Sequence, residues 1–422
     1  MQRHGRICKQ CDDSPGTRDC YELYTPYGIG SLEIANRFVR SATADLGPWK
    51  LGQFTDEDIA LYSELARGQV GLLIANGPGI FTEEALAGGS LDEEDYSYRK
   101  VRVQGTERLL AAVHDAAPKC KIFAQIGCNE IVSCDLPKGP SAIDSPYYEG
   151  TFRQLSAREI EWMIDALVQT IVRMRDEGFD GAQLHAAHGG GLWSFLSPYS
   201  NRRKDRFGGS VAKRVCIVRE IVGRARAKVG AFPILIKVNC DDFLDGGIDS
   251  SNFPELASQI QQAGIDAIEV SGGTWDALVR TEEELGFRPV PAAESRTDIL
   301  TPEKQSYFLP AVIGLALDIP IILVGGNRNV ERMEKIISEG HAQFVAMCRP
   351  LIREPELVER WRKGRGGEEA LCIACNSCIY SMHVPFEKLG RRVVSCLPEM
   401  NPSLHDEAQE WLGSFIDSIR VD

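Results

Sequence analysis

Residues 156–185 read SAREIEWMIDALVQTIVRMRDEGFDGAQLH, a helical pattern that passes directly into a strand pattern. Ser156 and Glu159 have the spacing of a capping box, which predicts that a helix begins at this point. Gly178 ends the pattern, and an apolar strand at 182–185 follows. The apolar face of the expected helix consists of Ile160, Met163, Ile164, Leu167, Ile171 and Met174. A helix that leads into a buried strand is typical of α/β proteins with a parallel sheet.

The order of helix, glycine, polar position and short apolar strand returns around Gly264 and Gly340. Other short apolar runs fit buried parallel strands. Together with residues 182–185 they bring the expected strands to eight, and the others lie at 38–42, 71–75, 121–125, 234–238, 267–270, 320–324 and 343–347.

Eight strands with intervening helices over residues 21–363 predict an α/β fold of the (β/α)₈, or TIM barrel, type, whose usual size is about 250 residues and more with insertions. A doubly wound sheet is the alternative, but no Gly-x-Gly-x-x-Gly run follows a first strand. Outside the barrel we expect a short N-terminal arm over residues 1–20 and a Cys-containing tail over 364–422. The arm, which we interpret as structural, holds Cys8, Cys11 and Cys20.

The composition is that of a globular enzyme, with 43% hydrophobic and 25% charged residues among 422. The formal net charge of −13 disfavours nucleic acid and anionic membranes as partners. No apolar run has the length of a membrane span, and the first residues lack the pattern of a signal peptide. We therefore expect a cytoplasmic enzyme that acts on a small-molecule substrate. The sequence leaves open whether it forms a homo-oligomer. The 13 cysteines are too sparse for a disulfide scaffold, so most should be reduced thiols or ligands.

Two imidazoles, His185 and His188, stand at the end of a predicted strand, and the polar loop 201–210 follows. In a (β/α)₈ barrel the carboxyl ends of the strands carry the active site. The pair therefore indicates a catalytic site. A zinc site or two core histidines would be the alternative, although zinc would need a third ligand that the sequence does not place.

Gly325 and Gly326 follow the seventh expected strand, and Cys348 and Arg349 follow the eighth. Loops at these two places often bind phosphate in (β/α)₈ barrels, through backbone N–H groups and a guanidinium. A tight turn and a surface ion pair would be the alternative.

Lys237 and Gln125 each end an otherwise apolar strand. A lysine at this end of a barrel strand normally faces an anion, and a glutamine amide can both donate to and accept from a heterocyclic ring. Each residue alone is more often structural. Together, at the ends of different strands, they indicate one site.

These motifs, in this order, resemble the Old Yellow Enzyme family of flavin oxidoreductases over about residues 21–360. The stretch 36–44 is similar to the family's first strand, and Gln125 to the glutamine that binds the flavin pyrimidine. The two histidines are similar to its substrate-binding pair. The loop 205–210, Lys237, the paired glycines and Cys348-Arg349-Pro350-Leu351 also fall in the family's order.

The resemblance implies that FMN is bound non-covalently at the carboxyl end of the barrel and is reduced by NADH or NADPH. By position, Lys237 would lie beside the flavin N1–C2=O edge, and His185 and His188 would donate hydrogen bonds to a substrate carbonyl or nitro oxygen. The residues that would contact the ring system are Ser41, Ala42, Thr43, Ala44, Gly77 and Gln125. Those that would hold the phosphate are Gly325, Gly326, Cys348 and Arg349.

Two positions depart from the family pattern. Gly190 occupies the place where ene-reductases of this family carry the tyrosine that protonates the α-carbon. Another acid or water could replace it, or the enzyme could act as a dehydrogenase or on an acceptor that needs no positioned proton. Ala44 stands where relatives often have a Cys or Thr that tunes the flavin potential.

A third departure is the tail, which resembles the cluster-binding segment of the 2,4-dienoyl-CoA reductase and trimethylamine dehydrogenase branch. Cys372, Cys375 and Cys378 have the compact C-x₂-C-x₂-C spacing that suits one face of a [4Fe–4S] cluster, and Cys396 could complete the ligand set. Those relatives have one more residue before the third cysteine, a shorter gap to the fourth, and a dinucleotide-binding module beyond. A zinc-bound or relict tail therefore stays open beside the cluster.

We predict an FMN-dependent NAD(P)H oxidoreductase that delivers hydride to an electron-poor alkene, such as an α,β-unsaturated carbonyl, or to a similar acceptor. One alternative is a flavin dehydrogenase of an amine or saturated carbonyl that passes electrons through a cluster in the tail. Another is a flavin-free lyase that uses the same phosphate site. The sequence identifies neither the substrate nor which of NADH and NADPH is the hydride donor.

Overall fold

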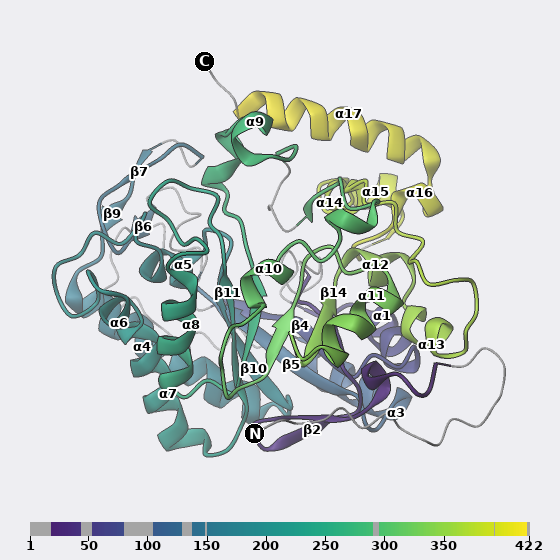
Figure 1. The fold of residues 1–422 in the computed structure, drawn as a ribbon, viewed down its shortest axis with the longest axis horizontal. Helices are drawn as coiled ribbons and strands as arrows, with labels where there is room; N and C mark the ends of the chain where they lie inside the picture. The colour runs from purple at the N-terminus through teal and green to yellow at the C-terminus, as the bar shows by residue number, and fades with distance from the viewer. Residues whose placement is uncertain are drawn as a thin grey trace.

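The computed structural model describes residues 18–43, 53–79, 104–128, 137–147, 150–289, 295–391 and 393–419. Eight parallel strands form one closed barrel (Figure 1). In order around the barrel they are β10 (Gly181–Ala186), β11 (Ile234–Asn239), β12 (Ala267–Ser271), β13 (Ile321–Leu323), β14 (Phe344–Met347), β3 (Phe38–Arg40), β4 (Leu72–Gly79) and β5 (Lys121–Gly127). Every predicted strand is present. The (β/α)₈ prediction is confirmed, and the doubly wound alternative is wrong because the sheet closes on itself.

Helices surround the strands and bury their apolar faces against them. The predicted helix is α4 (Ala157–Asp176), in which Ser156 and Glu159 form the expected capping box and the six residues of the apolar face are buried. The other main helices of the barrel are α1 (Asp56–Arg67), α3 (Thr106–Ala116), α7 (Cys216–Val229), α8 (Phe253–Gln262), α11 (Val330–Ser338) and α13 (Leu357–Arg362). Shorter ones are η1 (Glu22–Tyr24), α6 (Val211–Arg214), η6 (Pro302–Lys304), α10 (Leu309–Val312) and α12 (Arg349–Arg353).

Alternate strand residues point into the barrel. At the amino end these inward positions are apolar, and Phe123, Leu235 and Ala267 belong to one buried cluster. The hairpin of β1 (Tyr27–Ile29) and β2 (Leu32–Ile34) adds Ile29 and Ile34 to the same cluster and so closes this end.

Two residues further along the strands, the inward positions become polar. Gln183 is in register with Gln125, and Lys237 with Glu269. Ser41 continues the inward side of β3, two residues beyond Val39. We call these five residues the polar layer. The two-residue period of a strand thus places polar groups directly above an apolar base, facing the carboxyl end of the barrel, which we call the mouth.

Short elements and the tail lie at the mouth. The segment between β5 and α4 contains β6 (Lys138–Gly139), β7 (Asp144–Ser145), β8 (Gly150–Thr151) and β9 (Arg153–Gln154). The helices α5 (Gly191–Leu196), η4 (Asp276–Val279) and α9 (Glu282–Leu285) follow β10 and β12. The tail forms α14 (Ser377–Tyr380), α15 (Phe386–Leu389), α16 (Leu397–Met400) and α17 (Pro402–Ile419).

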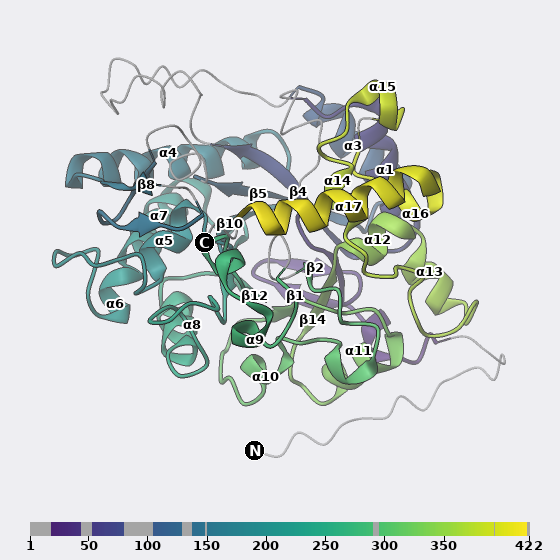
Figure 2. The same cartoon turned by 90° about the horizontal axis from the view of Figure 1, so that it is seen from above.

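Helix α17 packs against α14, α16 and η4. Figure 1 shows it above the barrel, and the view from above in Figure 2 shows it crossing over the strands. Part of the mouth is therefore covered by the tail. None of the helices in the described ranges has both the length and the apolar character that a bilayer crossing requires. Cys8 and Cys11 of the expected arm lie outside the described residues, and Cys20 is an exposed free thiol.

Candidate active site

The polar layer forms one continuous hydrogen-bond network. Lys237 Nζ donates to Ser41 Oγ at 3.0 Å and lies 3.4 Å from Glu269 Oε1. Ser41 Oγ donates to Glu269 Oε1 at 2.5 Å, and Gln183 Nε2 donates to Glu269 Oε2 at 2.7 Å. Gln125 Nε2 donates to Gln183 Oε1 at 2.8 Å. The network therefore connects side chains from five strands of the barrel.

The network leaves selected polar groups available. Lys237 is 4% exposed and lines a cavity, and among the described residues its ammonium has only Ser41 and Glu269 as partners, so one N–H is unused. The Gln125 Oε1 atom likewise accepts no hydrogen bond from the described residues. Lys237 is buried and Gln125 is half-buried, so both groups could form a further hydrogen bond with a polar ligand.

The cavity beside the polar layer is lined by most of the predicted cofactor residues. Its lining includes seven of them: Ser41, Ala42, Lys237, Gly325, Gly326, Cys348 and Arg349. It also includes Arg328 and Cys372, which the sequence did not assign to the cofactor. The structure thus brings the strand-end lysine and the late glycine turn into one space.

Gly325 and Gly326 have φ values of 103° and 72°, which glycine adopts readily and other residues rarely. A Cβ at Gly325 would lie 2.7 Å from the Phe308 ring, and one at Gly326 would lie 2.8 Å from the Tyr307 ring. Glycine is therefore required at both positions. The turn presents backbone rather than side chains to the cavity, as an anion-binding turn does.

Two arginines tie the cavity wall to other segments. Arg349 donates to the carbonyl oxygens of Ser295 at 3.0 Å and Arg296 at 2.9 Å, and to Asn376 Oδ1 at 2.6 Å. Arg328 donates to the carbonyl oxygens of Ala370 and Cys372, both at 2.8 Å. The Arg349 guanidinium thus has protein partners in addition to the phosphate role predicted for it.

Two of the remaining predicted flavin contacts, Thr43 and Gly77, lie against other predicted residues. Thr43 Oγ1 is 3.1 Å from Cys348 Sγ, which joins the end of the first barrel strand to that of the last. At Gly77 a Cβ would lie 2.3 Å from the Gln125 carbonyl oxygen, so glycine permits this close approach. Ala44 lies outside the described residues.

The two histidines meet at the mouth. His185 Nε2 and His188 Nδ1 are 3.4 Å apart, and His188 Nε2 is 2.8 Å from Ser271 Oγ. Burial, and then the charge of Lys237, lower the pKa of His185 to about 3 and that of His188 well below its usual value. Both imidazoles are therefore neutral at physiological pH, and a neutral imidazole retains one N–H donor.

The backbone around His188 is held in a left-handed conformation, with φ 60°. Its N–H donates to Asn239 Oδ1 at 3.1 Å, and Asn239 Nδ2 donates to the buried Asp242 at 2.8 Å. Asp242 also accepts from Trp193 and Ser197. The orientation of His188 is thus fixed by strand β11 and helix α5.

Gly190 begins helix α5, as its N-cap residue. Its neighbour Gly189 and the buried Asp276 line a second, small cavity. Burial raises the pKa of Asp276, whose carboxylate accepts from Ser145 Oγ at 2.5 Å. The position expected for a tyrosine therefore has no acid of its own, but an acid lies along the same cavity.

Among the tail cysteines, Cys372 lines the cavity beside the polar layer. Burial, followed by the nearby thiols of Cys348 and Cys372 among other groups, raises the pKa of Cys378. Ala374 and Asn376, between the cysteines, have φ values of 55° and 63°. Within the described ranges, no three His, Cys, Asp or Glu side chains are grouped as a single metal ion would require.

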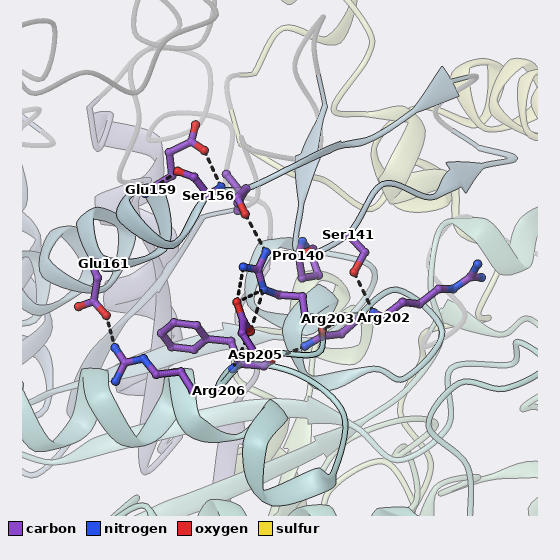
Figure 3. Close-up of polar contacts among 12 residues, drawn as sticks. Pro140, Ser141, Ser156, Glu159, Glu161, Arg202, Arg203, Asp205 and Arg206 are labelled. Carbon is purple, nitrogen blue, oxygen red and sulfur yellow. Dashed lines mark hydrogen bonds and ion pairs between the residues drawn. The ribbon is translucent and has the colours of Figure 1, made fainter.

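The polar loop 201–210 has a structural role that its proximity to the histidines did not predict. Arg203 donates to the carbonyl oxygens of Pro140 at 2.9 Å and Leu155 at 2.7 Å, and to Asp205 (Figure 3). Arg206 binds Glu161 of α4. The loop therefore attaches the segment between β5 and α4 to the barrel.

Sequence reasoning missed Gln183 and Glu269, which complete the polar layer. Each is a polar residue inside an apolar strand, on the same two-residue period as the inward-facing residues. That alternation could have identified them. Ser271 and Arg328 carried no comparable signal, because their partners come from distant segments.

Comparison with known proteins places the chain in a family. Residues 22–368 match the model of the NADH:flavin oxidoreductase / NADH oxidase family. An "NADH oxidase" of Thermoanaerobacter brockii is 32% identical over 369 residues, covering 85% of this chain and 53% of that protein. A "4,4'-dithiodibutanoate disulfide reductase" of Rhodococcus erythropolis is 28% identical over 387 residues, covering 86% and 93%.

The chain spans about half the length of the NADH oxidase and of a "metal reductase" of Desulforamulus reducens, 53% and 50% respectively. Solved structures share the fold. A 2-naphthoyl-CoA reductase complex has a TM-score of 0.72 at 23% identity, over 92% of this chain and 58% of that one. An Old Yellow Enzyme homologue from Zymomonas mobilis has a TM-score of 0.61 at 22% identity, over 84% and 96%. The Old Yellow Enzyme resemblance is thus confirmed, and the chain belongs to the NADH:flavin oxidoreductase / NADH oxidase family.

Proposed function

We propose that this protein is an FMN-dependent oxidoreductase that takes hydride from NADH or NADPH and delivers it to an electron-poor alkene, as in an α,β-unsaturated carbonyl. The observation that carries the proposal is the cavity in which the unused N–H of Lys237 and the Gly325-Gly326 turn meet. A cation at one side and a backbone turn at the other suit a ligand with an anionic ring edge and a phosphate.

The residues present fit FMN. Lys237 and Gln125 would contact the ring system, together with Ser41, Ala42, Thr43, Ala44 and Gly77. The backbone of Gly325 and Gly326, with Cys348 and Arg349, would hold the phosphate. Bound FMN supplies reversible hydride storage at N5. Lys237 provides the positive charge that favours the anionic reduced form of such a ring.

His185 and His188 would bind the substrate oxygen. Because both are neutral, each retains one N–H donor and brings no full positive charge to the mouth. A donor at the carbonyl oxygen withdraws electron density from the conjugated double bond and prepares its β-carbon for hydride. The α-carbon of the substrate then needs a proton, and Gly190 has no acidic side chain that could donate one. Water or another acid, such as Asp276 in the second cavity, would supply it in this proposal.

The tail supports a second candidate, a flavin dehydrogenase of an amine or saturated carbonyl. Cys372, Cys375, Cys378 and Cys396 would hold a [4Fe–4S] cluster beside the cofactor cavity. This candidate is supported by the C-x₂-C-x₂-C spacing and by the position of Cys372 in the cavity wall. It is also supported by the left-handed backbone of Ala374 and Asn376, because such conformations are common at ligand sites. A cluster there would relay electrons from the cavity.

We also propose a cytoplasmic location, a small-molecule substrate and a division into arm (1–20), barrel (21–363) and tail (364–422).

An anaerobic absorbance spectrum tests the function. The purified protein should be yellow, and NADH or NADPH should bleach its flavin band. No bleaching with either nicotinamide would refute the hydride-donor part, and a colourless protein that binds phosphate esters would favour a lyase. Iron and acid-labile sulfide in the wild-type protein, together with their loss in the Cys375→Ala variant, would support the cluster.

A further inference from the structure

Both oxygens of the Glu269 carboxylate have partners within the barrel. Its side chain is 0% exposed, Oε1 accepts from Ser41 and faces Lys237, and Oε2 accepts from Gln183. The positive charge that faces the cavity is therefore paired, from the side away from the cavity, with a negative charge 3.4 Å away. The field of a charge pair falls off faster with distance than that of a single cation.

The same carboxylate also orients two amides. A carboxylate only accepts hydrogen bonds, so Gln183 must turn its NH₂ group toward Glu269 and its carbonyl oxygen toward Gln125. Gln125 must then donate with its own NH₂ group to Gln183, which leaves its Oε1 atom unused. Through two amides, Glu269 thus determines that Gln125 offers an acceptor to a ligand.

We propose that Glu269 is a positioning residue that sets the reduction potential of the flavin, by offsetting the charge of Lys237 and by fixing the orientation of Gln125. This inference rests on the proposed function, because it requires a flavin in the cavity. A reduced flavin carries negative charge that Lys237 stabilises, and the Glu269 carboxylate weakens that stabilisation. Loss of the carboxylate charge should therefore favour the reduced form.

The test uses FMN-loaded protein and the variant Glu269→Gln, which keeps the size of the side chain and removes its charge. We expect the reduced flavin to be favoured at least tenfold more than in the wild type, a rise in midpoint potential of about 30 mV for a two-electron couple. The affinity for sulfite, which also places negative charge on the flavin, should rise in parallel. Glu269→Asp, which retracts the charge, should change both quantities in the same direction by less.

Asp180→Asn is the matched control. Asp180 accepts from Lys121 Nζ at 2.9 Å and precedes β10, so this carboxylate–lysine pair lies at the end of the barrel opposite the mouth. Its removal should leave the potential unchanged. Glu269→Gln with bound FMN and an unchanged potential would overturn the inference, and if that variant does not fold, an unchanged potential in Glu269→Asp would do so. A wild-type protein that binds no FMN would instead refute the proposed function.

Discussion

Lys237 and Arg203 are both buried cations near the mouth, with 5% of each side chain exposed, yet their surroundings differ. Each of the three guanidinium nitrogens of Arg203 has a protein acceptor, among Pro140, Leu155 and Asp205 (Figure 3). Lys237 has two partners for three N–H groups and lines a cavity. A buried cation whose donors are satisfied holds segments together, whereas one that lines a cavity with a donor to spare is able to bind a ligand.

The largest effect should follow from removing the charge pair at Lys237. Lys237→Met combined with Glu269→Gln removes both charges, so no uncompensated charge stays buried and the fold should persist. Without a cation beside the ring, flavin reduction by NADH or NADPH should slow by about 10²–10³-fold. Rapid-mixing absorbance measures this rate. A wild-type rate in the double variant would contradict a cofactor role for Lys237.

Arg203→Ala should affect stability instead. It leaves the buried carbonyl oxygens of Pro140 and Leu155 without their donor, at a cost of about 2–4 kcal/mol in the free energy of unfolding. Urea denaturation measures this loss of stability. The variant Arg203→Lys keeps the positive charge but not the several N–H donors of the guanidinium, so it should recover only part of the stability. The FMN affinity of the folded variant should equal that of the wild type. Unchanged stability would show that the loop does not hold this segment.

His188→Ala should separate the two half-reactions. We expect kcat/KM for an α,β-unsaturated carbonyl to fall by about 10²-fold, because a donor to the substrate oxygen is lost, while reduction by the nicotinamide stays unchanged. His114→Ala is the control, since His114 binds Asp180 away from the mouth. Equal losses in both half-reactions would indicate that His188 serves the flavin rather than the substrate.

A further effect concerns pH and stability. Because the pKa of His185 is about 3 in the folded protein, below the value of about 6.5 expected when unfolded, the unfolded state binds the extra proton between these limits. The stability associated with neutral His185 is thus present above pH 6.5 or so and is lost as the pH falls toward 3. In urea unfolding measured over this pH range, His185→Gln should reduce the slope of the unfolding free energy against pH by up to the equivalent of one bound proton. An unchanged slope would mean that His185 is not held neutral.

The sequence predicted the barrel well because its evidence is local. Apolar runs of strand length and the capping box at Ser156 depend on neighbouring residues, and the structure has all eight strands and the helix. The meeting of the strand-end residues was also within reach, since the strand ends of a (β/α)₈ barrel lie together at one end. Lys237 and Gly325 accordingly line the same cavity.

What the sequence did not predict depends on partners far along the chain. Glu269 looks like an isolated polar residue in an apolar strand until the barrel closes and brings Ser41 to its carboxylate. The role of Arg203 could not be predicted from the sequence because its acceptors, Pro140 and Leu155, belong to an irregular segment with little periodicity.

The most direct test of the central claim, that the polar layer faces a bound flavin, is an equilibrium titration of FMN into flavin-free protein, followed by quenching of flavin fluorescence. The wild type and Arg203→Ala should bind FMN with equal affinity, and the Lys237→Met and Glu269→Gln double variant should bind it at least tenfold more weakly. Equal binding by all three proteins, or none by the wild type, would contradict the account.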